Sequence, residues 1–194
     1  MDGEPRVANR KGRWGVRVFV MGGSGLIGRH LVRRLLKSGA RPVVVSRHVD
    51  RVKRQAEAGD FEVVQGDVEK PGRWQSAVDG CDAVVNLAGH NIFAERWNGE
   101  VKRKIRDSRV RGTDNLVSAI ASARDRPRIL VQGSAVGYYG PRADEELDES
   151  APPGSDFLAA VCREWEEASE PVETLGVRRA VIRTGIVLAP DEGA

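Results

Sequence analysis

Short apolar runs alternate along the chain with longer segments in which apolar residues recur every three or four positions. Short runs of this kind are typical of β-strands, and near-continuous valine, as at residues 43–45, indicates strands buried on both faces of a parallel sheet. The pattern predicts strands at residues 16–21, 42–45, 61–64, 83–87, 128–131 and 179–182.

The segments between these runs predict helices at residues 26–37, 100–123 and 155–169. In the first, Ile27, Leu31 and Leu35 are spaced four apart and form an apolar stripe, and Gly39 marks the end. Alternation of strand and helix predicts an α/β fold, a doubly wound parallel sheet of Rossmann type in a three-layer sandwich. Residues 140–154, with several prolines and acids, are expected to form a long loop.

Composition restricts the class of protein. At 194 residues, with 40% hydrophobic and 30% charged residues, the chain resembles one soluble globular domain. The net charge of +3 arises from interleaved bases and acids, which argues against a nucleic-acid-binding surface. No window reaches the roughly 18 consecutive apolar residues that a membrane span needs, so no membrane partner is expected.

The N-terminal segment and the cysteines indicate the compartment. Residues 1–15 are polar and basic without the apolar run of a secretory signal, and we expect a flexible lead-in to a domain spanning residues 16–194. Cys81 and Cys162 lie far apart without metal-binding spacing, so neither a metal site nor a disulfide framework is expected. A reducing, cytoplasmic compartment fits these features best.

A glycine-rich segment directly follows the first predicted strand and overlaps the start of the first helix. Gly22, Gly25 and Gly28 give a GxxGxxG spacing. Such glycines allow a tight turn, close approach of backbone N–H groups to a pyrophosphate, and close packing of helix and strand. The motif predicts dinucleotide binding, with a purely structural turn as the alternative; the residues involved are Gly22, Gly23, Ser24, Gly25, Leu26, Ile27 and Gly28.

The end of the second strand bears on the choice of cofactor. A site for NAD holds an acid there, which accepts a hydrogen bond from the ribose 2′-hydroxyl. This chain has Ser46 and Arg47 instead, and a hydroxyl with a guanidinium suits a 2′-phosphate. We therefore expect NADP(H), although Arg47 as a merely solvated cation remains an alternative because Asp50 is close in sequence.

Further motifs resemble the extended short-chain dehydrogenase/reductase superfamily. The matching runs are Gly66-Asp67-Val68, Asn86-Leu87-Ala88-Gly89, Arg111-Gly112-Thr113-Asp114-Asn115-Leu116 and Arg183-Thr184-Gly185. The resemblance implies that Asp67 and Val68 meet the adenine. It also implies that Leu87, Ala88 and Gly89 lie under the nicotinamide side of the cofactor.

Narrower matches are similar to the atypical epimerase-family branch, which includes the giant-chloroplast/SulA-like proteins. They are Arg96-Trp97, Ile105-Arg106-Asp107-Ser108-Arg109, Ser134-Ala135-Val136-Gly137-Tyr138-Tyr139-Gly140 and Trp165-Glu166. Members of this branch continue into a smaller substrate-binding portion, which this chain, ending at Ala194, is expected to lack.

The catalytic residues of the superfamily match only in part. Its Tyr and Lys, four residues apart at a helix start, are absent here: both frames, residues 157–161 and 158–162, lack the pair. Ser134 resembles the remaining catalytic serine, although alignment on Tyr139-Gly140 puts Ala135 in that place. Tyr138, Tyr139 or His90 are candidates to handle the proton, the alternative being a packed loop anchor for the tyrosines and a loop residue for His90.

Together these features predict an NADP(H)-binding oxidoreductase or epimerase acting on a carbonyl or alcohol carbon of an unknown small molecule. Ser134 would polarise the oxygen. The alternative is a non-catalytic dinucleotide-binding sensor or scaffold, which the missing Tyr and Lys favour. By analogy with the superfamily, the helices at residues 100–123 and 155–169 suggest a homodimer interface.

Overall fold

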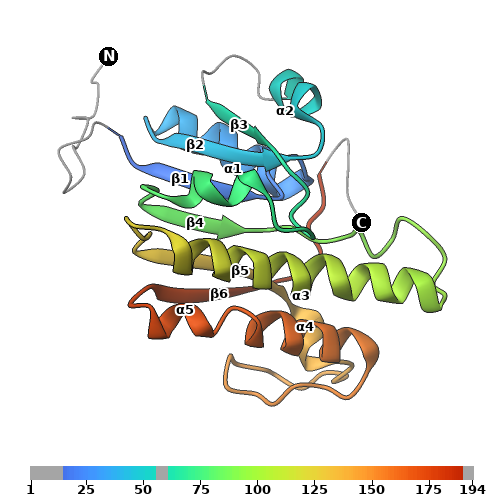
Figure 1. The fold of residues 1–194 in the computed structure, drawn as a ribbon. Helices are drawn as coiled ribbons and strands as arrows, with labels where there is room; N and C mark the ends of the chain where they lie inside the picture. Colours follow the sequence, from blue (N-terminus) through green and yellow to red (C-terminus); the bar gives the residue numbers. More distant parts are fainter. Residues whose placement is uncertain (1–14, 56–60, 190–194) are drawn as a thin grey trace, which may run out of the picture.

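The computed structural model describes residues 15–55 and 61–189; nearly all of the predicted lead-in, residues 1–14, lies outside them. Six parallel strands form one sheet in the order β3-β2-β1-β4-β5-β6, and their bounds are β1 Arg17–Met21, β2 Arg41–Ser46, β3 Glu62–Gln65, β4 Ala83–Asn86, β5 Ile129–Ala135 and β6 Arg178–Thr184 (Figure 1). This order confirms the predicted doubly wound sheet. The chain reverses direction across the sheet between β1 and β4, where α/β folds bind ligands.

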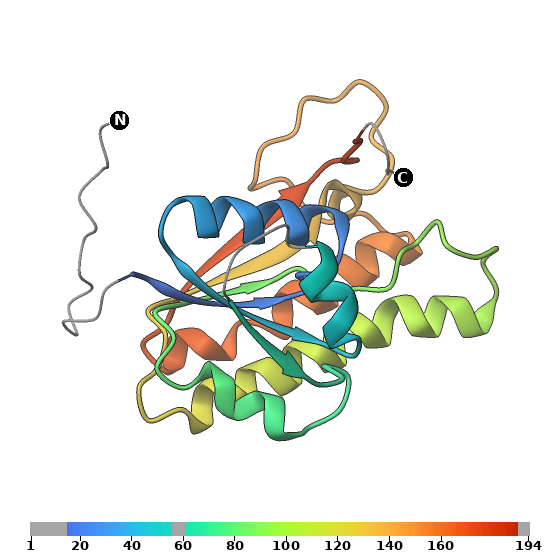
Figure 2. The same ribbon diagram turned by 90° about the horizontal axis from the view of Figure 1, so that it is seen from above.

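Helices cover both faces of the sheet (Figure 2). Helices α1 (Leu26–Lys37) and α2 (Val49–Gln55) pack on one face through a valine-rich cluster. The other face carries α3 (Gly99–Ser122), α4 (Phe157–Glu167), α5 (Pro171–Thr174) and the 3-10 helix η1 (Arg73–Val78). At the centre of that layer Trp74 is fully buried and stacks on Phe19, with ring centroids 6.1 Å apart.

Several predicted boundaries were wrong by a few residues. The helix predicted from residue 155 begins at Phe157 because Asp156 caps it, accepting a hydrogen bond from the Ala159 N–H at 2.8 Å. Strand β4 ends at Asn86, one residue early, because the Asn86 side chain accepts from the Ala88 N–H and turns the chain. Strand β5 extends four residues beyond its predicted end, through pairing with β6.

Three short elements carried no periodic signal and were not predicted: η1, α5 and the 3-10 turn η2 (Val136–Tyr139). Residues 140–154 contain neither helix nor strand, which confirms the predicted loop; it projects from the sheet beside the end of β6 (Figure 2). Within the described ranges, no helix combines the length and apolar character needed to cross a membrane.

Candidate functional site

The glycine-rich loop joins β1 to α1 with backbone packed on backbone. Gly22 has φ +76°, and a Cβ on it would lie 2.6 Å from the carbonyl of Leu87. A Cβ on Gly28 would lie 2.1 Å from the Gly22 oxygen. No side chain larger than hydrogen fits at either position, so these two glycines are required by the fold itself.

Gly25 differs from its neighbours because it is exposed and has an ordinary φ of −77°. A Cβ there would meet one atom, the Gly22 oxygen, at 3.4 Å. Gly25 is the N-cap of α1, no side chain caps that end, and the first turn contains no acid. The helix therefore presents unsatisfied N–H groups and the positive end of its dipole, which is the arrangement of an anion site.

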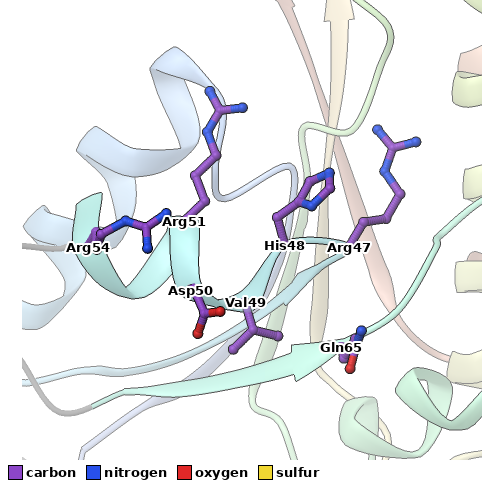
Figure 3. A pocket seen from close by; sticks show the side chains of 7 residues that line it. All are labelled: Arg47, His48, Val49, Asp50, Arg51, Arg54 and Gln65. Atoms are coloured by element: carbon purple, nitrogen blue, oxygen red, sulfur yellow. The ribbon is translucent and has the colours of Figure 1, made fainter.

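An open depression of about 710 Å³ lies at the carboxyl end of β2, beside this loop. Figure 3 shows Arg47, His48 and Arg51 extending to one side of the ribbon, whereas Asp50 extends to the other. Arg54 and Gln65 complete the lining together with Val49. The Ser46 hydroxyl accepts a hydrogen bond from the His48 N–H at 3.0 Å, which fixes the turn. The depression is therefore strongly cationic, with its one acid turned away from Arg47.

The resemblance motifs occupy positions that brace this edge of the sheet. Gly66 packs against Trp74, where a Cβ would come within 2.7 Å of the indole side chain, and Asp67 accepts from the Glu69 N–H. Asn115 on α3 donates to the Val68 carbonyl at 2.9 Å and so anchors the segment after β3. The structure places Asp67 and Val68 beside the β2 end, on the same carboxyl edge as the glycine-rich loop.

The segment after β4 lies against the glycine-rich loop. Asn86 donates to Thr113 Oγ1 at 2.9 Å and to Gln132 Oε1 at 3.0 Å, all three buried. Leu87 and Ala88 form the backbone surface on which Gly22 packs, and Gly89 is exposed. This network fixes the segment between β1 and β5 at the point where the chain changes direction.

Ser134 is buried in a charged network. Its hydroxyl donates to Glu166 Oε1 at 2.6 Å, and Arg183 donates to both oxygens of Glu166 at 2.9 Å. The pairing of β5 with β6 places Ser134 directly beside Arg183. Hydrogen bonds to Glu166 raise the pKa of Arg183. The Ser134 hydroxyl is thus engaged by a carboxylate of this chain.

Arg183 also contacts both tyrosines, Tyr138 and Tyr139. The guanidinium lies 3.5 Å from the ring centroid of Tyr138 and donates to Tyr139 Oη at 2.9 Å. Because Tyr139 Oη accepts from a cation, its own proton is left to donate elsewhere. Ser134 and both tyrosines therefore belong to one cluster organised by Glu166 and Arg183.

His90 lies apart from that cluster, at the end of the segment after β4. Its ring Nε2 is 3.3 Å from Glu95 Oε1, and its backbone N–H donates to Ser108 Oγ at 2.9 Å. Its carbonyl accepts from Arg109 Nη1 at 3.0 Å. The structure thus brings His90 together with Arg109, rather than with Ser134 or the tyrosines.

Sequence reasoning did not assign Glu166, Arg183 or Arg109 to the site, although each lies in a motif it quoted. A signal was present for Glu166: it follows Cys162 by four residues and so falls on the apolar face of α4, where a charged residue needs a partner. The partnership with Arg183 depends on strand register, which the sequence pattern does not specify.

Cys162 stands at the position that the superfamily's lysine would have if residues 158–162 were aligned with the Tyr and Lys pair. Its thiol is buried. Burial raises the pKa of Cys162, opposed by the Ala135 backbone hydrogen bond and the charge of Arg109. We expect iodoacetamide to alkylate Cys162 in the folded protein at least about 100-fold more slowly than in urea near neutral pH, measured by peptide mass spectrometry. Equal rates in both states would contradict this.

The same raised pKa fixes a pH dependence. A thiol whose folded pKa lies above its unfolded value of about 8.5 keeps its proton longer in the folded state, so stability is complete below that pH and falls as pH rises above it. The Cys162→Ala variant should lose less stability between neutral and alkaline pH than the unsubstituted chain, in urea unfolding at each pH.

Comparison with known proteins identifies the family. Residues 18–161 match the NAD dependent epimerase/dehydratase family. The chain belongs to this family. Its resemblance to atypical extended short-chain dehydrogenase/reductases of the epimerase family is thereby confirmed.

The chain is also similar to individual members of the epimerase family over most of its length. The chain is 41% identical over 179 residues to the chloroplastic SDR39U1 homolog of Arabidopsis thaliana, covering 91% of this chain and 50% of the relative. It is 31% identical to the human epimerase family protein SDR39U1 (isoform2), solved with NADPH, with a TM-score of 0.73 over 92% of this chain and 57% of that one. A nucleoside-diphosphate sugar epimerase from Corynebacterium glutamicum shares 34% identity, with a TM-score of 0.74 over 92% of this chain and 36% of the other. The chain thus spans about half the length, or less, of these relatives.

Proposed function

We propose that this chain binds NADP(H) along the carboxyl edge of β2, β1 and β4. The observation that carries the proposal is the pairing of an uncapped α1 N-terminus with a cationic depression at the end of β2. The first suits a pyrophosphate, and the second suits the 2′-phosphate that distinguishes NADP from NAD. The NADPH in the human relative's structure supports the same choice.

The residues present fit such a cofactor. Gly25 leaves open the space that a Cβ would fill at the mouth of the helix, and Gly89 leaves the segment after β4 without a side chain. Arg47 and Arg51 extend to the same side of the ribbon, and Asp50, the acid among the lining residues, extends to the other (Figure 3). Arg47 is therefore the residue we expect to select the 2′-phosphate.

Calorimetry with NADPH and NADH tests this assignment. Arg47→Asp should weaken NADPH binding by about 10- to 150-fold, the value of one charged hydrogen bond, and leave NADH nearly unchanged. Arg103→Asp is the matched control, because Arg103 is an exposed arginine on α3 and its replacement changes the net charge equally. Equal affinities of the unsubstituted chain for NADPH and NADH would refute the 2′-phosphate assignment.

We further propose that the bound cofactor serves hydride exchange at a carbonyl or alcohol carbon, which is the chemistry a nicotinamide supplies. In this chain Tyr139 is the best-placed proton donor, because Arg183 donates to its oxygen and leaves its own proton free. Arg183 in turn is held by Glu166, so the pair can orient the phenol without the superfamily's lysine. In this arrangement Ser134 donates a hydrogen bond to Glu166 and so helps to hold that carboxylate in place.

The alternative function is non-catalytic binding of the dinucleotide by a sensor or scaffold. Two observations favour it: the Ser134 hydroxyl is engaged by Glu166, and Cys162 stands where one frame would place the lysine. Stereospecific loss of deuterium from labelled NADPH in the presence of a panel of carbonyl compounds separates the two. Exchange that Tyr139→Phe abolishes supports the enzyme, whereas NADPH binding without exchange for any compound supports the sensor.

A further inference from the structure

Arg109 is the one arginine of α3 that is not exposed. Its neighbours Arg106 and Arg111 each form an ion pair with Asp107, and Arg106 also pairs with Glu164. Arg109 has no carboxylate partner within the described ranges. Burial lowers the pKa of its guanidinium. A desolvated charge without a counter-ion is costly to keep unless it is used.

The hydrogen bonds of Arg109 leave one edge of its guanidinium unused. Nη1 donates to the carbonyls of His90 and Ile105, both at 3.0 Å. A guanidinium has five N–H donors, so three of them, on Nε and Nη2, have no acceptor among the described residues. Neither nitrogen is among the fully buried unpartnered atoms, so this edge retains an approach from outside.

A second donor without a partner lies beside this guanidinium. The Arg109 Cζ is 5.1 Å from the ring centroid of Trp165, whose Nε1 is buried and makes no hydrogen bond to the described residues. The Trp165 side chain is 6% exposed. Helices α3 and α4 thus bring a guanidinium and an indole to one place, and each has N–H donors without an acceptor among the described residues.

The position of this pair relates it to the proposed cofactor site. A Cβ on Gly89 would lie 2.9 Å from Arg109 Cζ, so the guanidinium lies directly under the exposed segment that follows β4. Trp165 approaches the backbone of β5 at Gly133, where a Cβ would be 3.4 Å from the indole. The pair therefore lies at the carboxyl ends of β4 and β5, away from the cationic depression at β2.

We propose that Arg109 and Trp165 form a subsite for a carboxylate group of the substrate. The planar edge of a guanidinium matches the two oxygens of a carboxylate, and the Trp165 ring packs against the guanidinium beside it. One unpaired cation balances one carboxylate, whereas a phosphate dianion would require more positive charge than the subsite offers. The assignment to substrate rests on the proposed function, which puts the nicotinamide at this edge.

Titration of the isotope-labelled chain with sodium acetate tests the subsite directly. The indole N–H resonance of Trp165, assigned through Trp165→Phe, should shift saturably with acetate when sodium chloride keeps the ionic strength constant. In Arg109→Met the affinity should fall by about 10-fold or more, and Arg109→Lys should retain part of it. Arg103→Met, an exposed arginine on the same helix, is the matched control and should bind acetate unchanged.

Each other outcome has a fixed meaning. A Trp165 resonance that does not shift saturably in the unsubstituted chain overturns the subsite, and this holds even if Arg109→Met does not fold. Equal shifts in Arg109→Met and Arg103→Met overturn it as well, and tighter saturation by inorganic phosphate overturns the choice of carboxylate.

NADPH affinity distinguishes a substrate subsite from a cofactor contact. Arg109→Met should bind NADPH within about threefold of the unsubstituted chain, because the subsite is for substrate. A loss as large as that of Arg47→Asp would show that Arg109 holds the cofactor, and the substrate assignment would fall. Saturable acetate binding in a chain that does not bind NADPH would leave the subsite standing and refute the proposed function instead.

Discussion

Replacing Gly25 with alanine is expected to reduce NADPH affinity by about 100-fold, or roughly 2.8 kcal/mol, while leaving the fold stable. The added Cβ meets the Gly22 oxygen at 3.4 Å, which the backbone tolerates at φ −77°. It projects, however, at the mouth of α1, where backbone N–H groups are exposed for an anion. Calorimetry with NADPH and thermal melting of the same sample measure the two effects separately.

Gly28→Ala and Gly99→Ala are the controls for Gly25→Ala. At Gly28 a Cβ would lie 2.1 Å from the Gly22 oxygen, so alanine must displace backbone and should cost roughly 3 kcal/mol of stability. At Gly99, the first residue of α3, a Cβ meets nothing within 4 Å, and alanine should affect neither stability nor binding. If Gly25→Ala bound NADPH as tightly as Gly99→Ala, the glycine-rich loop would be a structural turn only.

Replacing Arg183 with leucine is expected to lower the free energy of unfolding by about 3–5 kcal/mol, because it leaves the Glu166 carboxylate buried without a cation. The side chains of Arg183 and Glu166 are only 17% and 11% exposed, and the substitution also removes the hydrogen bond to Tyr139. Urea denaturation measures the loss.

A second ion pair on α4 provides the control. Arg106 and Glu164 approach to 2.6 Å, but their side chains are 46% and 31% exposed. Arg106→Leu should therefore cost less than about 1 kcal/mol. The double variant Glu166→Leu with Arg183→Leu should be more stable than Arg183→Leu alone, because no charge is left unpaired. Similar costs for Arg183→Leu and Arg106→Leu would show that the buried network contributes no more than a surface pair.

Elements with a strong local signal were predictable from the sequence. Helix α1 has the predicted bounds because its apolar stripe, its glycine start and its stop signals agree. The valines at residues 43–45 likewise indicated a strand buried on both faces, and these residues of β2 are buried. In contrast, η1 is six residues long and owes its place to the packing of Trp74 against Gly66 and Phe19. Such contacts between segments far apart in sequence leave no periodic pattern.

The candidate site divides in the same way. The glycine-rich loop and Arg47 were predictable because each follows a strand directly, so position along the chain determines position in space. The network of Ser134, Glu166 and Arg183 was not, because it joins two strands and a helix through register and helix rotation. The unpaired state of Arg109 likewise depends on which acids its neighbours on α3 already hold.

The place of β1 in the middle of the sheet affects how the protein is made. β1 pairs with β2 on one side and with β4 on the other, and the register with β4 joins Met21 to Asn86. During synthesis β1 therefore waits for more than sixty further residues before its partner β4 exists. Until then a nascent chain exposes one unpaired edge of a strand that is buried in the folded protein, and such an edge is a template for aggregation.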